Sequence, residues 1–319
     1  MDPSDLNPTG NAEVSEVSGA DDAGTPALTR RLARAAETVH GLSYYGSEIN
    51  RFTEDGFRGW WHAYFAYRLA PLGPVNARTA TAVFYNFAPR MVERAVPGVW
   101  DVLTPGAVLA RREELVGQVL TRVFGDGTHH ETLTEAADLA TEAVSRLNLE
   151  ARPLAAAHVA LPQPAAADLP VVTDAKRLWH AATVWREYRG DSHNIALAAA
   201  GIDGPSSHLL MIAKGRGNRE VIGRIRGWTD PEWNRAAAEL RERGILAPGD
   251  RFTEHGSAFR DAIETTTDRL SAAPVATLGV ERAERLFALM RSLSEFLTAR
   301  GEVAGVWPPP TVGGSSPGS

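Results

Sequence analysis

The chain has 319 residues, of which 44% are hydrophobic and 23% are charged, and its formal net charge is −6. This composition is typical of a globular protein long enough for two domains, and the acidic balance gives no general reason to bind nucleic acid or an anionic membrane. The absence of cysteine excludes disulfides, thiolate metal sites and a cysteine nucleophile, and it is typical of a reducing cytosol. No apolar run approaches the roughly 20 residues that cross a bilayer, so we expect a cytoplasmic protein.

Both ends of the sequence are poor in core-forming residues. Residues 1–26 are acidic and rich in Gly, Ser, Asp and Pro, without the basic start and apolar core of a signal peptide. Residues 308–319 begin with successive prolines and end in Gly and Ser. We therefore expect a disordered leader and a disordered tail.

Helical patterns fill the first half of the chain. Apolar residues at helical spacing predict a helix over residues 27–40, and a second helix leads to Phe52. A third helix starts at Trp60 and is so rich in aromatic side chains that most of its sides must be buried; Gly73 and Pro74 end it. Further helices are predicted at residues 76–85, from 89 onward, at 113–124 and at 135–147, with a short turn and strand at 106–108.

The second half follows a linker rich in Ala and Pro, predicted at residues 162–173. A turn at residues 227–230 precedes a helix at 231–243, which Gly244 ends. Two short strands at 245–247 and 251–253 flank a tight turn and predict a hairpin. The remaining helices are predicted at residues 175–188, 195–200, 206–214, 219–225, 254–270 and 281–299.

One motif occurs twice at a constant separation. Arg58-Gly59 is followed by His62 and later by Gly73-Pro74, and Arg189-Gly190 is followed by His193 and later by Gly204-Pro205. Each residue of the first copy lies 131 positions before its counterpart in the second. A repeat that keeps its register over this distance predicts two copies of one fold.

The second copy resembles a known family at the segment Ala238-Glu239-Leu240-Arg241-Glu242-Arg243-Gly244-Ile245-Leu246 and at Phe252-Thr253-Glu254-His255-Gly256. Helix–turn–helix, hairpin and long helix follow one another as in a winged helix, and the segment is similar to that in which the recognition helix of MarR-type regulators runs into the wing. The resemblance covers roughly residues 175–299 and, through the repeat, more weakly 28–161. The whole chain also looks like a group of actinobacterial tandem helix-turn-helix proteins.

The resemblance implies a mainly α fold with small β-hairpin wings. Because MarR proteins are homodimers joined by their terminal helices, two MarR-like units in one chain, at residues 27–161 and 174–307, would form an intramolecular pseudo-dimer. The cavity between two such units is free to become asymmetric. We expect a monomer or a weak dimer.

The charge pattern of the candidate recognition helix disfavours DNA binding. The helix begins with Asp230 and Glu232, and its arginines at 241 and 243 lie away from the turn that usually contacts bases. A basic cluster precedes it, and we interpret this cluster first as a solvated face and alternatively as a phosphate-binding surface. The cluster consists of Lys214, Arg216, Arg219, Arg224 and Arg226.

Ionisable side chains around both motifs instead predict a polar pocket between the two units. His193, Asp191 and His62 are the predicted catalytic residues, because an Asp beside a His suits acid–base chemistry. Arginine suits a carboxylate or phosphate, and tyrosine adds a donor. The residues expected to bind an anionic or polar ligand are Arg58, Tyr64, Arg68, Tyr85, Asn86, Arg186, Glu187 and Arg189.

A structural interpretation of the same residues is left open. Arg189 with Glu187 or Asp191 would form an interdomain ion-pair network, His62 would be a satisfied core histidine, and Asn86 would cap a helix. No phosphate loop, nucleophile elbow or zinc motif is present, so we expect neither a cofactor nor a metal.

The leading interpretation is a small-molecule-binding winged-helix protein, and an acid–base enzyme of specialised metabolism if it is catalytic. The alternative is a MarR-like, ligand-responsive DNA-binding transcriptional regulator.

Overall fold

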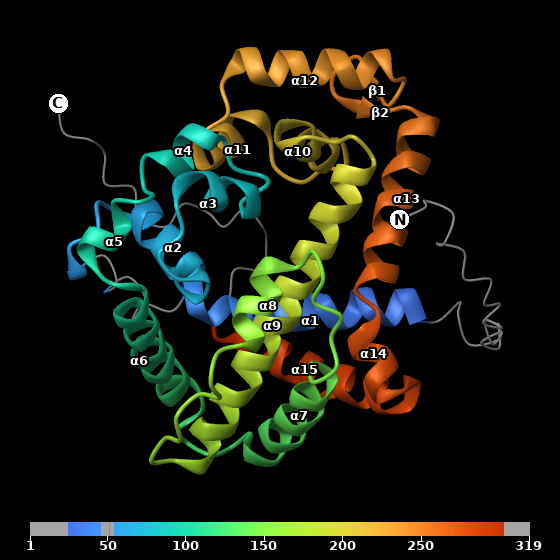
Figure 1. Cartoon of the computed structure of the whole chain (residues 1–319). Coiled ribbons are helices and arrows are strands. Elements are labelled where there is room, and N and C mark those ends of the chain that lie inside the picture. Colours follow the sequence, from blue (N-terminus) through green and yellow to red (C-terminus); the bar gives the residue numbers. More distant parts are fainter. Residues whose placement is uncertain (1–24, 46–50, 52–53, 303–319) are drawn as a thin grey trace, which may run out of the picture.

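The computed structural model describes residues 25–45, 51 and 54–302. Of the leader expected at residues 1–26 only Thr25 and Pro26 are described, and they begin the first helix; the tail expected at residues 308–319 lies outside the described residues. Helices dominate the described chain, with a single two-stranded sheet. Figure 1 shows a lower body of packed helices, an upper head, and two long helices that connect them. A third group of short helices lies beside the head.

The body is built from helices at both ends of each predicted unit. The helix α1 (Thr25–Tyr45) packs against α9 (Pro170–Ala199) and α15 (Val280–Ala299), and α7 (His130–Ala143) packs against the same two helices. Their apolar faces share one large core. The body also contains α6 (Pro105–Phe124), α8 (Pro153–Val159) and α14 (Ala273–Leu278).

The helix α9 links the body to the head. It runs for 30 residues and begins with Pro170 in its first turn, where the missing amide hydrogen costs nothing. Apolar residues occur on all its sides, and most of its side chains are buried. Such an all-round pattern is typical of a helix enclosed by others, here α1, α6, α7, α8 and α13 (Glu254–Leu270).

The head has its own small core. Its helices are α10 (Gly204–Ala213), α11 (Arg219–Arg226) and α12 (Asp230–Glu242), and Trp233 fills the centre of this core. Side chains of Asp203 and Asn218 cap the starts of α10 and α11, and Thr229 with Glu232 forms a capping box at α12. These are the helix–turn–helix elements that the sequence predicts.

The wing follows α12 as predicted. Strand β1 (Leu246–Ala247) pairs antiparallel with β2 (Arg251–Phe252), and Thr253 then caps α13 through the amide of Gly256 at 2.9 Å. A Cβ on Gly256 would lie 1.9 Å from the carbonyl oxygen of Ile245, so only glycine fits where α13 crosses the wing. This close approach explains the Thr-x-x-Gly pattern physically.

The first predicted unit is also helical, but it has no wing. After the first motif come α2 (Trp60–Leu69) with the short η2 (Ala70–Leu72), then α3 (Ala77–Val83), α4 (Pro89–Glu93) and α5 (Val99–Val102). The predicted repeat would pair them, in order, with the end of α9, α10, α11 and α12. The prediction of wings in both units is wrong for the described part of residues 27–161, which contains no strand; residues 106–108 lie in α6.

One further finding concerns membranes. Among the described residues, no single helix is long and apolar enough to cross a bilayer, and α9 with α10 meets the length and composition test only as a pair bent by 100°.

Candidate functional site

The helix α12 lies along the outer edge of the head, with the wing beside one end (Figure 1). Trp233 and Leu240 point into the head core, whereas Asn234, Arg235 and Glu239 are exposed. The capping box and the wing fix both ends of the helix. This is the arrangement in which a helix can enter a major groove.

The cations of α12 are engaged by nearby carboxylates. Arg235 contacts Asp203 at 2.9 Å and Glu239 at 2.8 Å. Arg241 contacts Asp250 at 2.9 Å, and Asp250 also pairs with Arg219. Both arginines of α12 therefore have a carboxylate partner, and the helix itself carries more acidic than basic residues, as the sequence predicts.

A second group of cations remains unpaired at the surface. Lys214, Arg216, Arg224 and Arg251 are exposed, and among the described residues none of them makes an ion pair. Lys214 and Arg216 lie in the turn between α10 and α11, Arg224 lies on α11, and Arg251 lies in the wing. Residues 203–254 carry nine Lys or Arg against eight Asp or Glu, so this group of exposed cations reflects how the charges are distributed and not a large excess of positive charge.

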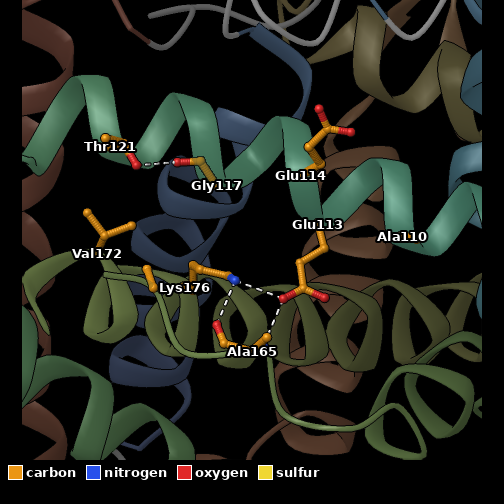
Figure 2. A pocket seen from close by; sticks show the side chains of 9 residues that line it. Ala110, Glu113, Glu114, Gly117, Thr121, Ala165, Val172 and Lys176 are labelled. Atoms are coloured by element: carbon orange, nitrogen blue, oxygen red, sulfur yellow. Dashed lines mark hydrogen bonds and ion pairs between the residues drawn. The ribbon is translucent and has the colours of Figure 1, made fainter. Parts of the chain in front are cut away.

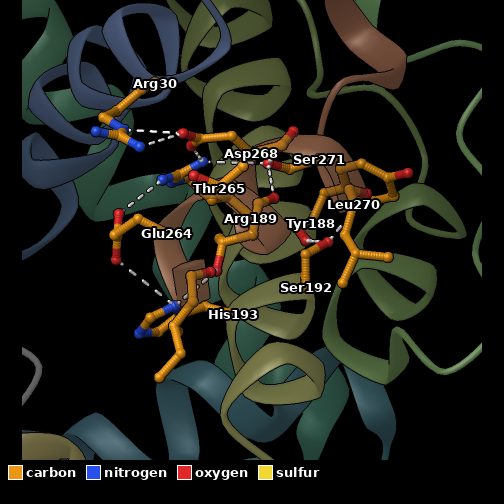
Figure 3. Close-up of polar contacts among 12 residues, drawn as sticks. Arg30, Tyr188, Arg189, Ser192, His193, Glu264, Thr265, Asp268, Leu270 and Ser271 are labelled. Carbon is orange, nitrogen blue, oxygen red and sulfur yellow. Dashed lines mark hydrogen bonds and ion pairs between the residues drawn. The ribbon is translucent and has the colours of Figure 1, made fainter. Parts of the chain in front are cut away.

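The second motif lies where α9, α13 and α1 meet, and Figure 3 shows its polar network. Nη1 of Arg189 is 2.7 Å from Oδ1 of Asp268, and Nη2 is 3.4 Å from Glu264. Nδ1 of His193 lies 3.0 Å from the hydroxyl of Thr267. Burial lowers the pKa of His193 to about 4, so its imidazole is neutral at neutral pH.

Asp191 faces another element altogether. Its carboxylate accepts a hydrogen bond of 3.0 Å from the amide of Ala155, near the start of α8. Burial raises the pKa of this carboxyl to about 6. Asp191 and His193 are two positions apart on one helix and point to different neighbours, so no contact joins them.

Four of the predicted ligand residues do come together. Arg68 on α2 donates to Glu187 on α9 at 2.9 and 2.6 Å and to the hydroxyl of Tyr64 at 3.1 Å. Arg186 donates to the same carboxylate at 2.9 Å. Burial acts to raise the pKa of Glu187, but Arg186 and Arg68 outweigh it and hold that pKa well below its usual range. This is a buried ion-pair network between the two halves.

In the first motif Arg58 and His62 contact each other, and the Arg58 guanidinium also lies 3.4 Å from the carbonyl oxygen of Arg94. The backbone amide of Arg58 lies 3.3 Å from Nδ1 of His62, and its guanidinium lies 3.4 Å from Nε2. Burial, and then the charge of Arg58, lowers the pKa of His62. The hydrogen bonds of His62 thus differ from those of His193, whose ring contacts α13.

Tyr85 and Asn86 contact the head instead of facing the ion-pair network. The Tyr85 hydroxyl donates to the carbonyl of Ile202, and the amide oxygen of Asn86 accepts from Ser207 at 3.0 Å. Ala88 is the N-cap of α4 and has no side-chain cap, so the interpretation of Asn86 as a helix cap is wrong.

An open depression of about 350 Å³ lies between α6 and α9 (Figure 2). Its polar groups are already engaged, since Nζ of Lys176 donates to Glu113 at 2.8 Å and to the carbonyl of Ala165 at 2.6 Å. None of the predicted site residues lines it. Within residues 25–45, 51 and 54–302, no group of His, Asp and Glu has an arrangement that would hold a metal ion.

Reasoning from the sequence missed Arg90 and Trp228, which connect the first unit to the head. The only signal available was that Trp228 lies in the predicted turn before α12.

A family model described as a helix-turn-helix family matches residues 29–304. No curated protein and no solved structure matches the chain.

Proposed function

Since the chain belongs to this helix-turn-helix family, we propose that it is a DNA-binding regulator that places α12 in the major groove of duplex DNA. The observation that carries the proposal is the position of the unpaired cations. Lys214, Arg216 and Arg224 lie on the elements that precede α12, and Arg251 lies on the wing that follows it. In winged and helix-turn-helix proteins such flanking cations neutralise phosphates while the exposed helix reads bases.

The ion pairs on α12 do not oppose this function. The side chains of Arg235 and Glu239 are each 50% exposed, and exposed pairs of this kind contribute about 0–1 kcal/mol. A DNA phosphate therefore replaces the carboxylate partner of Arg235 at little cost. Asn234 then offers an amide of the kind that recognises adenine.

We also propose that the chain consists of two MarR-like units in a pseudo-dimer. Two observations support this proposal: the order of helices after each motif is the same, and the first and last helices of the two units (α1, α7, α9 and α15) pack together. A regulator of this kind acts in the cytoplasm, as the cysteine-free sequence predicts.

The test is DNA binding by the double variant Arg216→Ala/Arg224→Ala. Fluorescence anisotropy with duplexes that the protein selects from a random library measures the affinity across salt concentrations. Each lost phosphate contact reduces the salt slope by about 1, so we expect a slope lower by about 2 and weaker binding to every duplex.

The matched control is Arg285→Ala/Arg291→Ala on α15, which removes the same charge from exposed positions on the body. It should leave affinity and slope nearly unchanged. Equal losses in both variants would show that only net charge matters, and no binding by the wild type at low salt would refute the proposal.

A second candidate function, binding of a small anionic molecule, has one observation in its favour. Nε of Arg68 is buried without a hydrogen-bond partner, and the same guanidinium donates to the Tyr64 hydroxyl and to Glu187. Benzoate and phosphate serve as probes and should raise the melting temperature of the wild type. They should not raise the melting temperature of Arg68→Met, measured against that variant without a probe because the variant itself is less stable. No shift with either probe would contradict this site. Catalysis by His193, Asp191 and His62 stays a prediction that turnover assays of such ligands would test.

A further inference from the structure

The surface between the first unit and the head is centred on one residue. The carbonyl of Asn86 accepts hydrogen bonds from Nε1 of Trp228 at 3.1 Å and from Nε2 of His208 at 3.0 Å. Its side-chain oxygen accepts from Ser207 at 3.0 Å. One residue of the first unit therefore holds both α10 and the turn before α12.

A second residue acts on the start of α12 itself. Nη1 of Arg90 donates to Oε1 of Glu232 at 2.7 Å, and Nη2 donates to the carbonyl of Gly227. Glu232 is the acidic residue of the capping box, where its carboxylate accepts from the amide of Thr229 at 2.8 Å. The hydrogen bond from Arg90 lowers the pKa of Glu232 to about 2. The first turn of α12 is thus tied to α4.

Backbone atoms also meet at this surface. The amide of Ala88 donates to the carbonyl of Arg226 at 2.9 Å. A Cβ on Gly204 would lie 2.6 Å from Cζ2 of Trp228 and 2.9 Å from the carbonyl oxygen of Tyr85, so α10 approaches too closely for any side chain. Contacts of this kind require one fixed orientation of the two surfaces.

We infer that α3 and α4, with the segment between them, form a clamp that fixes the direction of α12, and that Asn86 and Arg90 are positioning residues for DNA recognition. The inference rests on the DNA binding proposed above. It assigns the first unit a different role from the second: its short helices hold the reading head, whereas α12 and the wing meet the duplex. Because α5 has only four residues and the described part of residues 27–161 contains no strand, the first unit offers no second recognition helix.

The clamp predicts that its loss would weaken sequence preference more than overall DNA affinity. A recognition helix that is free to tilt still approaches phosphates but no longer aligns its side chains with base edges. Loosening the clamp should therefore reduce the preference for a specific sequence and leave the salt-dependent, non-specific affinity almost intact.

The test uses the full chain and three variants: Asn86→Ala, Arg90→Ala and Gly204→Ala. One control is Arg282→Ala, which breaks another bidentate arginine–carboxylate pair, between α15 and α7 in the body. The other is Gly106→Ala, which adds a Cβ to the first turn of α6 where no atom lies within 4 Å. Arg90→Lys keeps the charge and should recover part of the loss.

Two measurements are made on each protein. Hydrogen exchange of the Ala88 amide reports the clamp without DNA, and we expect it to be at least about 10-fold faster in the variants than in the controls. The second measurement is the affinity for a selected duplex and for an unrelated duplex, each of about 20 base pairs, or two turns of the groove. The ratio of the two affinities is the sequence preference. We expect this preference to fall about 10-fold in the variants.

The outcomes separate the two claims. Unchanged exchange at Ala88 in all three variants overturns the clamp, and faster exchange with an unchanged preference overturns the positioning role. A wild-type protein that binds neither duplex refutes the DNA-binding function, and the positioning role with it. Thermal melting identifies any variant that fails to fold. If Arg90→Ala fails to fold, Arg90→Lys is compared with the wild type in its place.

Discussion

Glu187 is a carboxylate whose side chain is only 2% exposed, and it lies within the core that joins α2 and α9. Two guanidiniums, those of Arg68 and Arg186, share its two oxygens. A buried charge is tolerated when it is paired in this way, and it is costly once a partner is removed.

Replacement of Arg68 by Met tests this pairing. The variant leaves Glu187 without its closest partner, and we expect the free energy of unfolding to fall by about 3–5 kcal/mol. Urea denaturation measures it, with Arg285→Met at an exposed pair as the control, expected within about 0.5 kcal/mol of wild type. A cost below about 1 kcal/mol for Arg68→Met would show that water or other groups replace the guanidinium.

At the scale of residues, the sequence indicated which side chains would make polar contacts better than it indicated which residues they would contact. It predicted that Arg186, Arg189 and His193 share one pocket, and the structure distributes them between the ion-pair network around Glu187 and the contact with α13. Helical spacing gives the direction of each side chain from its own axis. It does not indicate which neighbouring helix lies in that direction, because that depends on the packing of the whole chain.

At the scale of elements, the sequence predicted the wing of the second unit correctly and the wing of the first unit wrongly. The turn at Gly249 and the cap at Thr253 are local signals, and both act as expected. In the first unit the short turn and strand expected at residues 106–108 belong to α6 instead, and the rest of the expectation of a second wing came from the repeat. Turn and cap residues therefore predicted the strands more accurately than the internal repeat did.

Gly256→Ala should disrupt the wing. The added methyl group would overlap the carbonyl of Ile245, which is backbone and cannot move aside cheaply, and we expect a loss of roughly 3 kcal/mol or more, at the upper end for overpacking. Thermal melting measures the loss, and Gly117→Ala on α6, where no atom lies within 4 Å of the new Cβ, is the control. An unchanged melting temperature for Gly256→Ala would mean that α13 and the wing separate easily.

At the scale of the whole molecule, buried histidines make stability depend on pH. Burial lowers the pKa of His158 to about 3 and the pKa values of His180 and His208 to about 4, against 6.5 for a free imidazole. Between pH 6.5 and 4 the unfolded chain therefore binds protons that the folded protein does not, and stability falls as the pH falls. Each histidine contributes up to about 1.4 kcal/mol per pH unit.

Asp191 opposes this trend, because its pKa of about 6 lets the folded protein take up one proton in the same range. The net prediction is a loss of unfolding free energy from pH 6.5 downward, and little change from pH 7 to 8. Urea titrations at pH 7, 6 and 5 measure it, and His208→Asn should make the dependence shallower. Stability that rises on acidification would show that the carboxyl groups dominate.

The length of α9 gives the body mechanical leverage over the head. A helix of 30 residues extends about 45 Å at 1.5 Å per residue. Turning such a rod by roughly 5° about its lower end carries its upper end through about 4 Å, which exceeds the rise of roughly 3.4 Å between stacked base pairs. In the DNA-binding function proposed above, a change of packing too small to disturb the core would therefore shift the register of α12 along the duplex by one base pair, unless a second attachment of the head resists the rotation.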